Sequence, residues 1–164
     1  MIEQKTVVNG FTWIPMESRK SRLVGEKPPR KPEKRQPLLW LARDGNDLYL
    51  VNASGESLDC VTARSCGFRG AEDDYESISA NAEYTYKDVK PNEAVKVEHY
   101  DRYYDCDYIL QVRLKVQSAG LGCIEMVSPL AKGGVGESVL LWDSGESGKD
   151  VAVEKCREAD ASLA

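Results

Sequence analysis

The chain has 164 residues, of which 41% are hydrophobic, and a formal net charge of −5. This composition is typical of one folded domain with appendages and excludes an intrinsically disordered chain. No stretch approaches the roughly 18 consecutive apolar residues of a membrane-spanning helix, and the N-terminus lacks the basic and apolar regions of a secretory signal. We therefore expect no association with a membrane.

The first 37 residues differ in character from the rest. Residues 1–17 predict a strand, or a hairpin around the turn-forming pair Asn9-Gly10. Residues 18–37 are basic and contain four prolines, which favours an extended linker or arm. Residues 1–39 sum to a charge of +5 and the remainder to −10. Nucleic acid is therefore an unlikely partner, because only the basic arm has the right sign of charge to contact phosphate.

Residues 38–143 carry the clearest pattern, which is a series of short apolar or alternating segments separated by turns. Residues 70–81 are polar and acidic and predict a loop or a short helix. Residues 90–93, with Pro91 in second position, predict a type I turn. Strands are expected at 38–42, 48–51, 58–66, 83–89, 95–98, 110–116, 123–127 and 139–142.

Seven or eight strands without crossover helices predict an all-β fold, an antiparallel two-layer β-sandwich. At the level of architecture the pattern resembles immunoglobulin-like and fibronectin-like sandwiches. Asp101, Tyr104 and Cys106 match the D-x-x-Y-x-C approach to one strand of antibody domains, although no tryptophan lies between Cys60 and Cys106. The polar tail, residues 144–164, could form one short helix from about Lys149.

The five cysteines indicate a reducing compartment. Their number is odd, and no two of them form a CxxC pair. We therefore expect thiols rather than disulfides, and a cytoplasmic location. The cysteines are Cys60, Cys66, Cys106, Cys123 and Cys156.

One glycine-rich segment, residues 132–138, resembles the deviant Walker A loop of ParA/MinD-type ATPases over seven residues. Glu137 stands where that family needs a lysine to reach the nucleotide phosphates. The segment is therefore interpreted as a flexible connection between two strands. The only histidine, His99, ends an alternating strand and is expected to be structural rather than a catalytic base. We assign no catalytic residue, no cofactor and no metal.

The candidate binding residues lie in the loop formed by residues 99–108, between the strands expected at 95–98 and 110–116. Loops at the end of a sandwich display recognition residues, and tyrosine gives a large contact area at low entropic cost. Three alternatives stay open for this loop: strand termination without any ligand, a metal held by His99 or Cys106 together with aspartates, and carbohydrate recognition. The candidate residues are Tyr100, Asp101, Tyr103, Tyr104 and Asp105.

The sequence thus predicts a non-enzymatic cytoplasmic module that binds a protein partner through this loop, a sheet edge or the basic arm. A sheet edge would also permit a homodimer. The alternative is a small-ligand module that binds carbohydrate or metal through the loop at residues 99–108. Its tyrosines, with Trp13, Trp40 or Trp142, would stack on sugar rings, and its aspartates would bind sugar hydroxyls. A third alternative is an enzyme whose site the sequence does not reveal.

Overall fold

The computed structural model describes residues 4–15, 34–71, 74–101, 103 and 106–156. The described residues form eleven strands and no helix. Their bounds are β1 Thr6–Val8, β2 Pro37–Asp44, β3 Asp47–Asn52, β4 Leu58–Ala71, β5 Asp74–Val89, β6 Glu93–His99, β7 Tyr108–Ser118, β8 Gly122–Val127, β9 Ala131–Lys132, β10 Ser138–Trp142 and β11 Ala152–Lys155. No helix long or apolar enough to span a membrane occurs among these residues.

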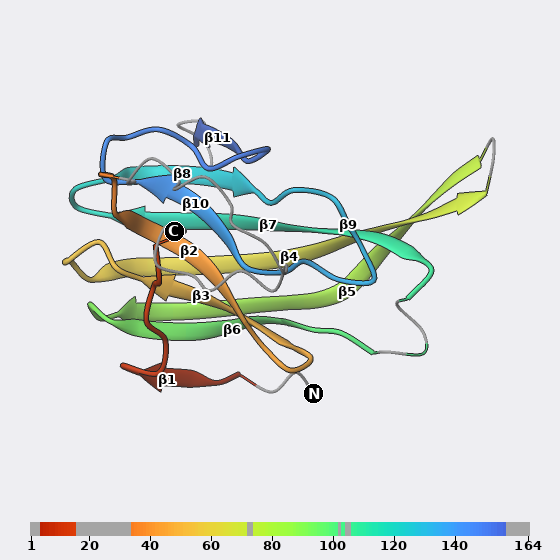
Figure 1. Ribbon diagram of the computed structural model, residues 1–164, viewed down its shortest axis with the longest axis horizontal. Helices are drawn as coiled ribbons and strands as arrows, with labels where there is room; N and C mark the ends of the chain where they lie inside the picture. Colours follow the sequence, from red (N-terminus) through yellow and green to blue (C-terminus); the bar gives the residue numbers. More distant parts are fainter. Residues whose placement is uncertain (1–3, 16–33, 72–73, 102, 104–105, 157–164) are drawn as a thin grey trace, which may run out of the picture.

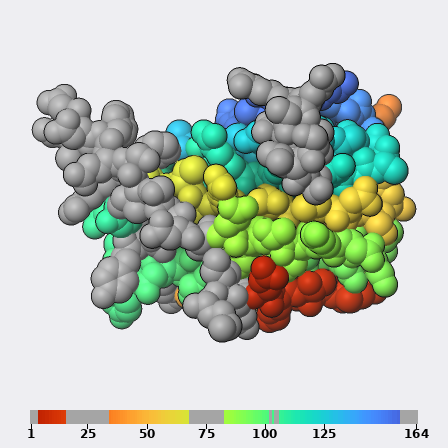
Figure 2. All heavy atoms as spheres, turned by 180° about the vertical axis from the view of Figure 1, so that it is seen from behind, coloured from red at the N-terminus to blue at the C-terminus, as the bar shows by residue number. Residues whose placement is uncertain are grey.

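Two antiparallel sheets pack face to face, so the predicted β-sandwich is confirmed (Figure 1). Sheet A has the strand order β1-β6-β3-β2-β10. Sheet B has the order β11-β8-β7-β4-β5, and β9 pairs with β7. The view from behind shows the outer side of sheet B, with β4, β5, β7 and β8 in yellow, lime and cyan (Figure 2).

The main core lies between the sheets, where inward-facing side chains of sheet B alternate with outward-facing ones. Along β7, for example, Val112, Leu114 and Val116 are fully buried, and Arg113 between them is exposed. Sheet A behaves differently, because most residues of β2, β3 and β6 are buried whichever way they point. Its outer face must therefore be covered as well.

The cover is the N-terminal strap, which we define as residues 4–15. Its first part is β1, which pairs with β6 in the register Thr6↔Val95. The chain then crosses the outer side of sheet A, where Trp13 meets Trp40 with ring centroids 5.3 Å apart. The strand expected in residues 1–17 is thus present, and its partner is β6 rather than a second strand of a local hairpin. Residues 16–33, which include most of the predicted arm, lie outside the described residues.

The turn at residues 90–93 also differs from its prediction. Glu93 N donates to Lys90 O at 3.1 Å, which closes a four-residue turn. Asn92, in third position, has a φ of 67°. A positive φ at this position, after a proline, belongs to a type II turn rather than the expected type I.

The segment at residues 70–81 was expected to be a loop or a short helix, and this expectation is wrong. It belongs to a long hairpin in which Arg69 pairs with Glu76 and Ala71 with Asp74. The hairpin formed by β4 and β5 projects past the packed sheets at one end of the molecule (Figure 1). Residues 70–81 are mostly small, polar or acidic, so the alternation of apolar residues by which a strand is recognised in a sequence is missing there.

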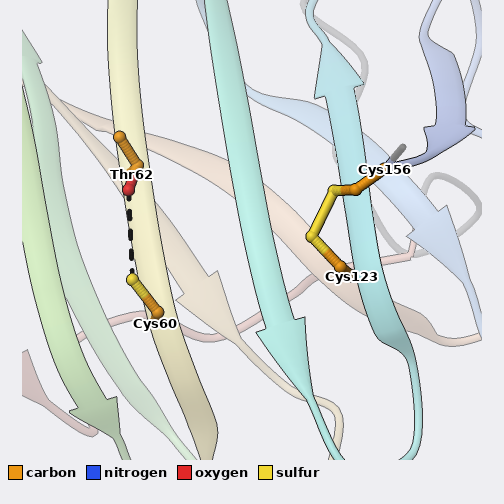
Figure 3. The surroundings of a disulfide bond; sticks show 4 residues. All are labelled: Cys60, Thr62, Cys123 and Cys156. Atoms are coloured by element: carbon orange, nitrogen blue, oxygen red, sulfur yellow. Dashed lines mark hydrogen bonds between the residues drawn. A yellow bond between two sulfur atoms is a disulfide. The ribbon is translucent and has the colours of Figure 1, made fainter. Parts of the chain in front are cut away.

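The expectations for the tail and for the cysteines both need correction. Ala152–Lys155 is strand β11, which pairs with β8 in the register Ala152↔Val127, and residues 157–164 lie outside the described part. A disulfide joins Cys123 of β8 to Cys156, whose Cα atoms are 5.4 Å apart (Figure 3). The apolar stripe of a tail helix would be thin, whereas the strand gains ladder hydrogen bonds and a covalent link to its neighbour. The disulfide also removes the main argument for a reducing compartment.

Replacing Cys123 by serine should lower the free energy of unfolding by about 3–4 kcal/mol, the loss expected when a disulfide closing a loop of this length is removed. Urea denaturation followed by far-ultraviolet circular dichroism measures this. Reductant should shift the wild-type midpoint to that of Cys123→Ser and leave the variant unchanged. A variant as stable as the non-reduced wild type would contradict a stabilising disulfide.

Candidate functional site

The loop at residues 99–108 has both buried and exposed side chains. Tyr100 is buried, with only 2% of its surface exposed, whereas Tyr103 is 89% exposed. The carboxylate of Asp101 accepts a hydrogen bond from Tyr103 N at 2.8 Å, which holds the start of the loop in a tight bend. Tyr104 and Asp105 lie outside the described residues. Of the candidate binding residues that the structure describes, Tyr100 therefore belongs to the core, whereas Asp101 and Tyr103 are exposed.

The packing of Tyr100 also explains why the segment at residues 132–138 is rich in glycine. The Arg43 guanidinium lies 4.7 Å above the Tyr100 ring and donates to Val135 O at 3.0 Å. A Cβ at Gly134 would lie 2.9 Å from that ring, and Gly134 has a φ of 136°. The segment resembling a Walker A loop is therefore a connection between β9 and β10 whose glycine permits close packing over Tyr100.

His99 lies in a small polar cluster at the end of β6. His99 Nδ1 donates to Asp47 Oδ1 at 2.6 Å, and the ammonium of Lys96 lies 3.5 Å from the same oxygen. Partial burial acts to raise the pKa of the Asp47 carboxyl, but the His99 hydrogen bond and the Lys96 charge outweigh it and hold that pKa below its ordinary value. The arrangement neutralises a buried ammonium, which favours a structural role for His99.

The metal alternative gains no support from this end of the molecule. Among the described residues no three histidine, cysteine or carboxylate side chains lie close enough together to hold an ion. Cys106 is exposed, and its thiol contacts the carbonyl of Tyr103 at 3.5 Å. Cys106 also precedes β7 rather than lying in a strand, unlike the antibody motif that it resembles in sequence.

Sequence reasoning missed the edge of the projecting hairpin. Strand β5 runs over 16 residues and pairs with β4 along one side only. Near the body β5 lies next to sheet A, where the Tyr86 hydroxyl donates to Lys96 O at 2.6 Å. Beyond the register shift between Arg64 and Cys66, the hairpin continues past the sheets, and its β5 side has no neighbouring strand among the described residues. An open β edge of this kind can accept a further strand.

The outer face of sheet B carries a second feature that the sequence did not reveal. A hollow of about 380 Å³ continues into another of about 250 Å³, and Thr62, Glu83 and Lys115 line both. We call the two together the trough. Its lining also includes Cys60, Arg64, Thr85, Lys87, Arg113, Leu114, Gln117 and Glu125. These residues come together only through the register of β4, β5, β7 and β8, and that register cannot be read from a single sequence.

Comparisons with protein-family models, with curated proteins and with solved structures find no match to this chain.

The polar cluster predicts how stability depends on pH. Because the pKa of Asp47 is lower in the folded than in the unfolded protein, its carboxylate stabilises the fold above about pH 4 and progressively less as the pH falls from there through the folded value. Urea midpoints measured between about pH 6 and pH 2 should therefore fall less steeply for Asp47→Asn than for wild type. Equal acid slopes in the two proteins would exclude this role for Asp47.

Two tyrosines of the loop, Tyr100 and Tyr103, should differ in how much stability is lost when each is replaced by alanine. Tyr100→Ala should cost about 3–5 kcal/mol of folding free energy, as for other buried aromatic residues. Tyr103→Ala should change stability by no more than about 0.5 kcal/mol, because its ring is exposed. Chemical denaturation of the two variants checks both values, and similar losses would show that the loop packs differently.

Proposed function

We propose that this protein is a non-enzymatic interaction module that binds a protein partner through strand addition at the β5 edge of the projecting hairpin. The observation that supports the proposal best is the length of this edge, which continues beyond the sandwich with no strand beside it in the described part of the chain. Main-chain hydrogen bonds would supply much of the affinity, and side chains near the edge would supply specificity.

The position of the loop at residues 99–108 supports the same proposal. It leads into β7, whose first residue Tyr108 pairs with Arg69 of the hairpin. Loop and hairpin therefore share one end of the molecule (Figure 1). Tyr103 is the most exposed large hydrophobic residue among the described ones. Its ring would add side-chain contact area beside the main-chain pairing.

We further propose that the module works in an oxidising compartment rather than in the cytoplasm. The support is the Cys123–Cys156 disulfide, since such bonds persist mainly where thiols are not kept reduced. The partner can be a second copy of the chain, because two identical antiparallel edges can pair about a two-fold axis.

A photo-cross-linking residue placed at Ser77 of β5 or at Tyr103 should capture the partner from an extract of the source cells. The same residue at Ser144, in the exposed connection after β10, is the matched control, because β10 ends at the opposite end of the molecule (Figure 1). A product with twice the chain mass of 18.2 kDa would identify a second copy. Equal capture from all three positions, or capture from Ser144 alone, would contradict the proposed surface.

A further inference from the structure

The trough on the outer face of sheet B combines features of a ligand site that the proposed hairpin surface does not use. In the cross-strand register, Arg64 of β4 stands directly opposite Arg113 of β7. Like charges directly opposite each other in a sheet are destabilising. A counter-charge would relieve this repulsion, and the neighbouring residues supply only part of it.

Glu83 is the counter-charge that the structure shows. Both Arg64 Nε and Arg64 Nη2 donate to Glu83 Oε2, at 2.9 and 2.8 Å. Among the described residues no carboxylate lies within ion-pair distance of Arg113. Around the trough as a whole, four cationic side chains face two carboxylates, on a chain whose net charge is −5. The trough is thus a local positive surface on an acidic protein.

The remaining lining residues define the rest of the ligand. Thr62 of β4 stands opposite Thr85 of β5. Gln117 of β7 stands opposite Cys60 of β4. Hydroxyl and amide groups exchange hydrogen bonds with the hydroxyls of a polyol. None of the described residues that line the trough is aromatic, so they give a neutral sugar no ring to stack on. A volume of about 380 Å³ is within the usual range for a small-molecule site.

We propose that the trough binds an anionic saccharide. A carboxylate or sulfate group of the ligand lies between Arg64 and Arg113, and the ring hydroxyls face Thr62, Thr85 and Gln117. The anion supplies the counter-charge that the arginine pair lacks, and guanidinium groups recognise both acid groups with paired hydrogen bonds. This site is independent of the hairpin edge, so either proposal can fail without the other.

Isothermal titration calorimetry of the full chain tests the proposal with three probes of similar length. A glucuronate-containing hexasaccharide presents carboxylates, a heparin hexasaccharide presents sulfates, and maltohexaose is neutral. One or both of the anionic probes should bind, and the neutral one should not. Comparing the two anionic probes shows which acid group the trough prefers.

Three variants locate the binding. Arg113→Gln should weaken the binding of the anionic saccharide about tenfold, since the substitution removes a charge-assisted contact. Glu83→Gln should tighten this binding about two- to fivefold, because the substitution releases Arg64 from its ion pair. Lys149→Gln changes the net charge by the same amount as Arg113→Gln, but its exposed side chain lies outside the trough lining, and binding should change less than about twofold.

The proposal is overturned if neither anionic probe binds, or if Lys149→Gln weakens binding as much as Arg113→Gln, which would indicate diffuse attraction to basic residues elsewhere. It is also overturned if an oligoglutamate peptide binds as tightly as the saccharides with the same dependence on Arg113, because the trough would then recognise acidic peptides.

Discussion

The rest of the structure depends on the burial of both faces of sheet A. One face packs against sheet B, and the other carries Trp40, Tyr49 and Val51, which cannot remain exposed to water without a large cost. The N-terminal strap provides the cover, so a stretch of chain far from β2 in sequence becomes a third layer. This also explains why β1, with only three residues, is a stable edge strand, since the aromatic contacts that follow it anchor the same segment.

Sheet A is covered on both sides, whereas no described strand covers the outer face of sheet B, and its β5 edge continues beyond the sandwich. Its inward side chains belong to the core, and its outward ones form the trough. The edge of β5 lies next to sheet A near the body, where Tyr86 donates to Lys96 O, and moves away from it where the hairpin projects beyond the sandwich. Both proposed binding surfaces therefore belong to sheet B, where the outward-facing side chains do not pack in the core between the sheets.

The sequence predicted the parts of the fold that burial imposes on local pattern. Alternation identified β7, and continuous apolar runs identified β2 and β10, because those strands pack against the core. The same reasoning failed for the hairpin tip, whose sequence is mostly small, polar or acidic, and for β11, which is largely exposed. It also misplaced Tyr100, because a tyrosine in a polar loop has the same local pattern whether it points inward or outward. The trough depends on cross-strand register, and the disulfide on the approach of β11 to β8, and neither is a local property of the chain.

The aromatic cluster under the strap has a consequence for spectroscopy. The chain contains three tryptophans, and Trp13 lies 5.3 Å from Trp40 and 6.1 Å from Trp142, measured between ring centroids. All intrinsic tryptophan emission therefore originates from one place, on the side of sheet A that faces away from sheet B. Fluorescence will report release of the strap even if the sandwich stays folded. Events on the outer face of sheet B will leave that signal almost unchanged.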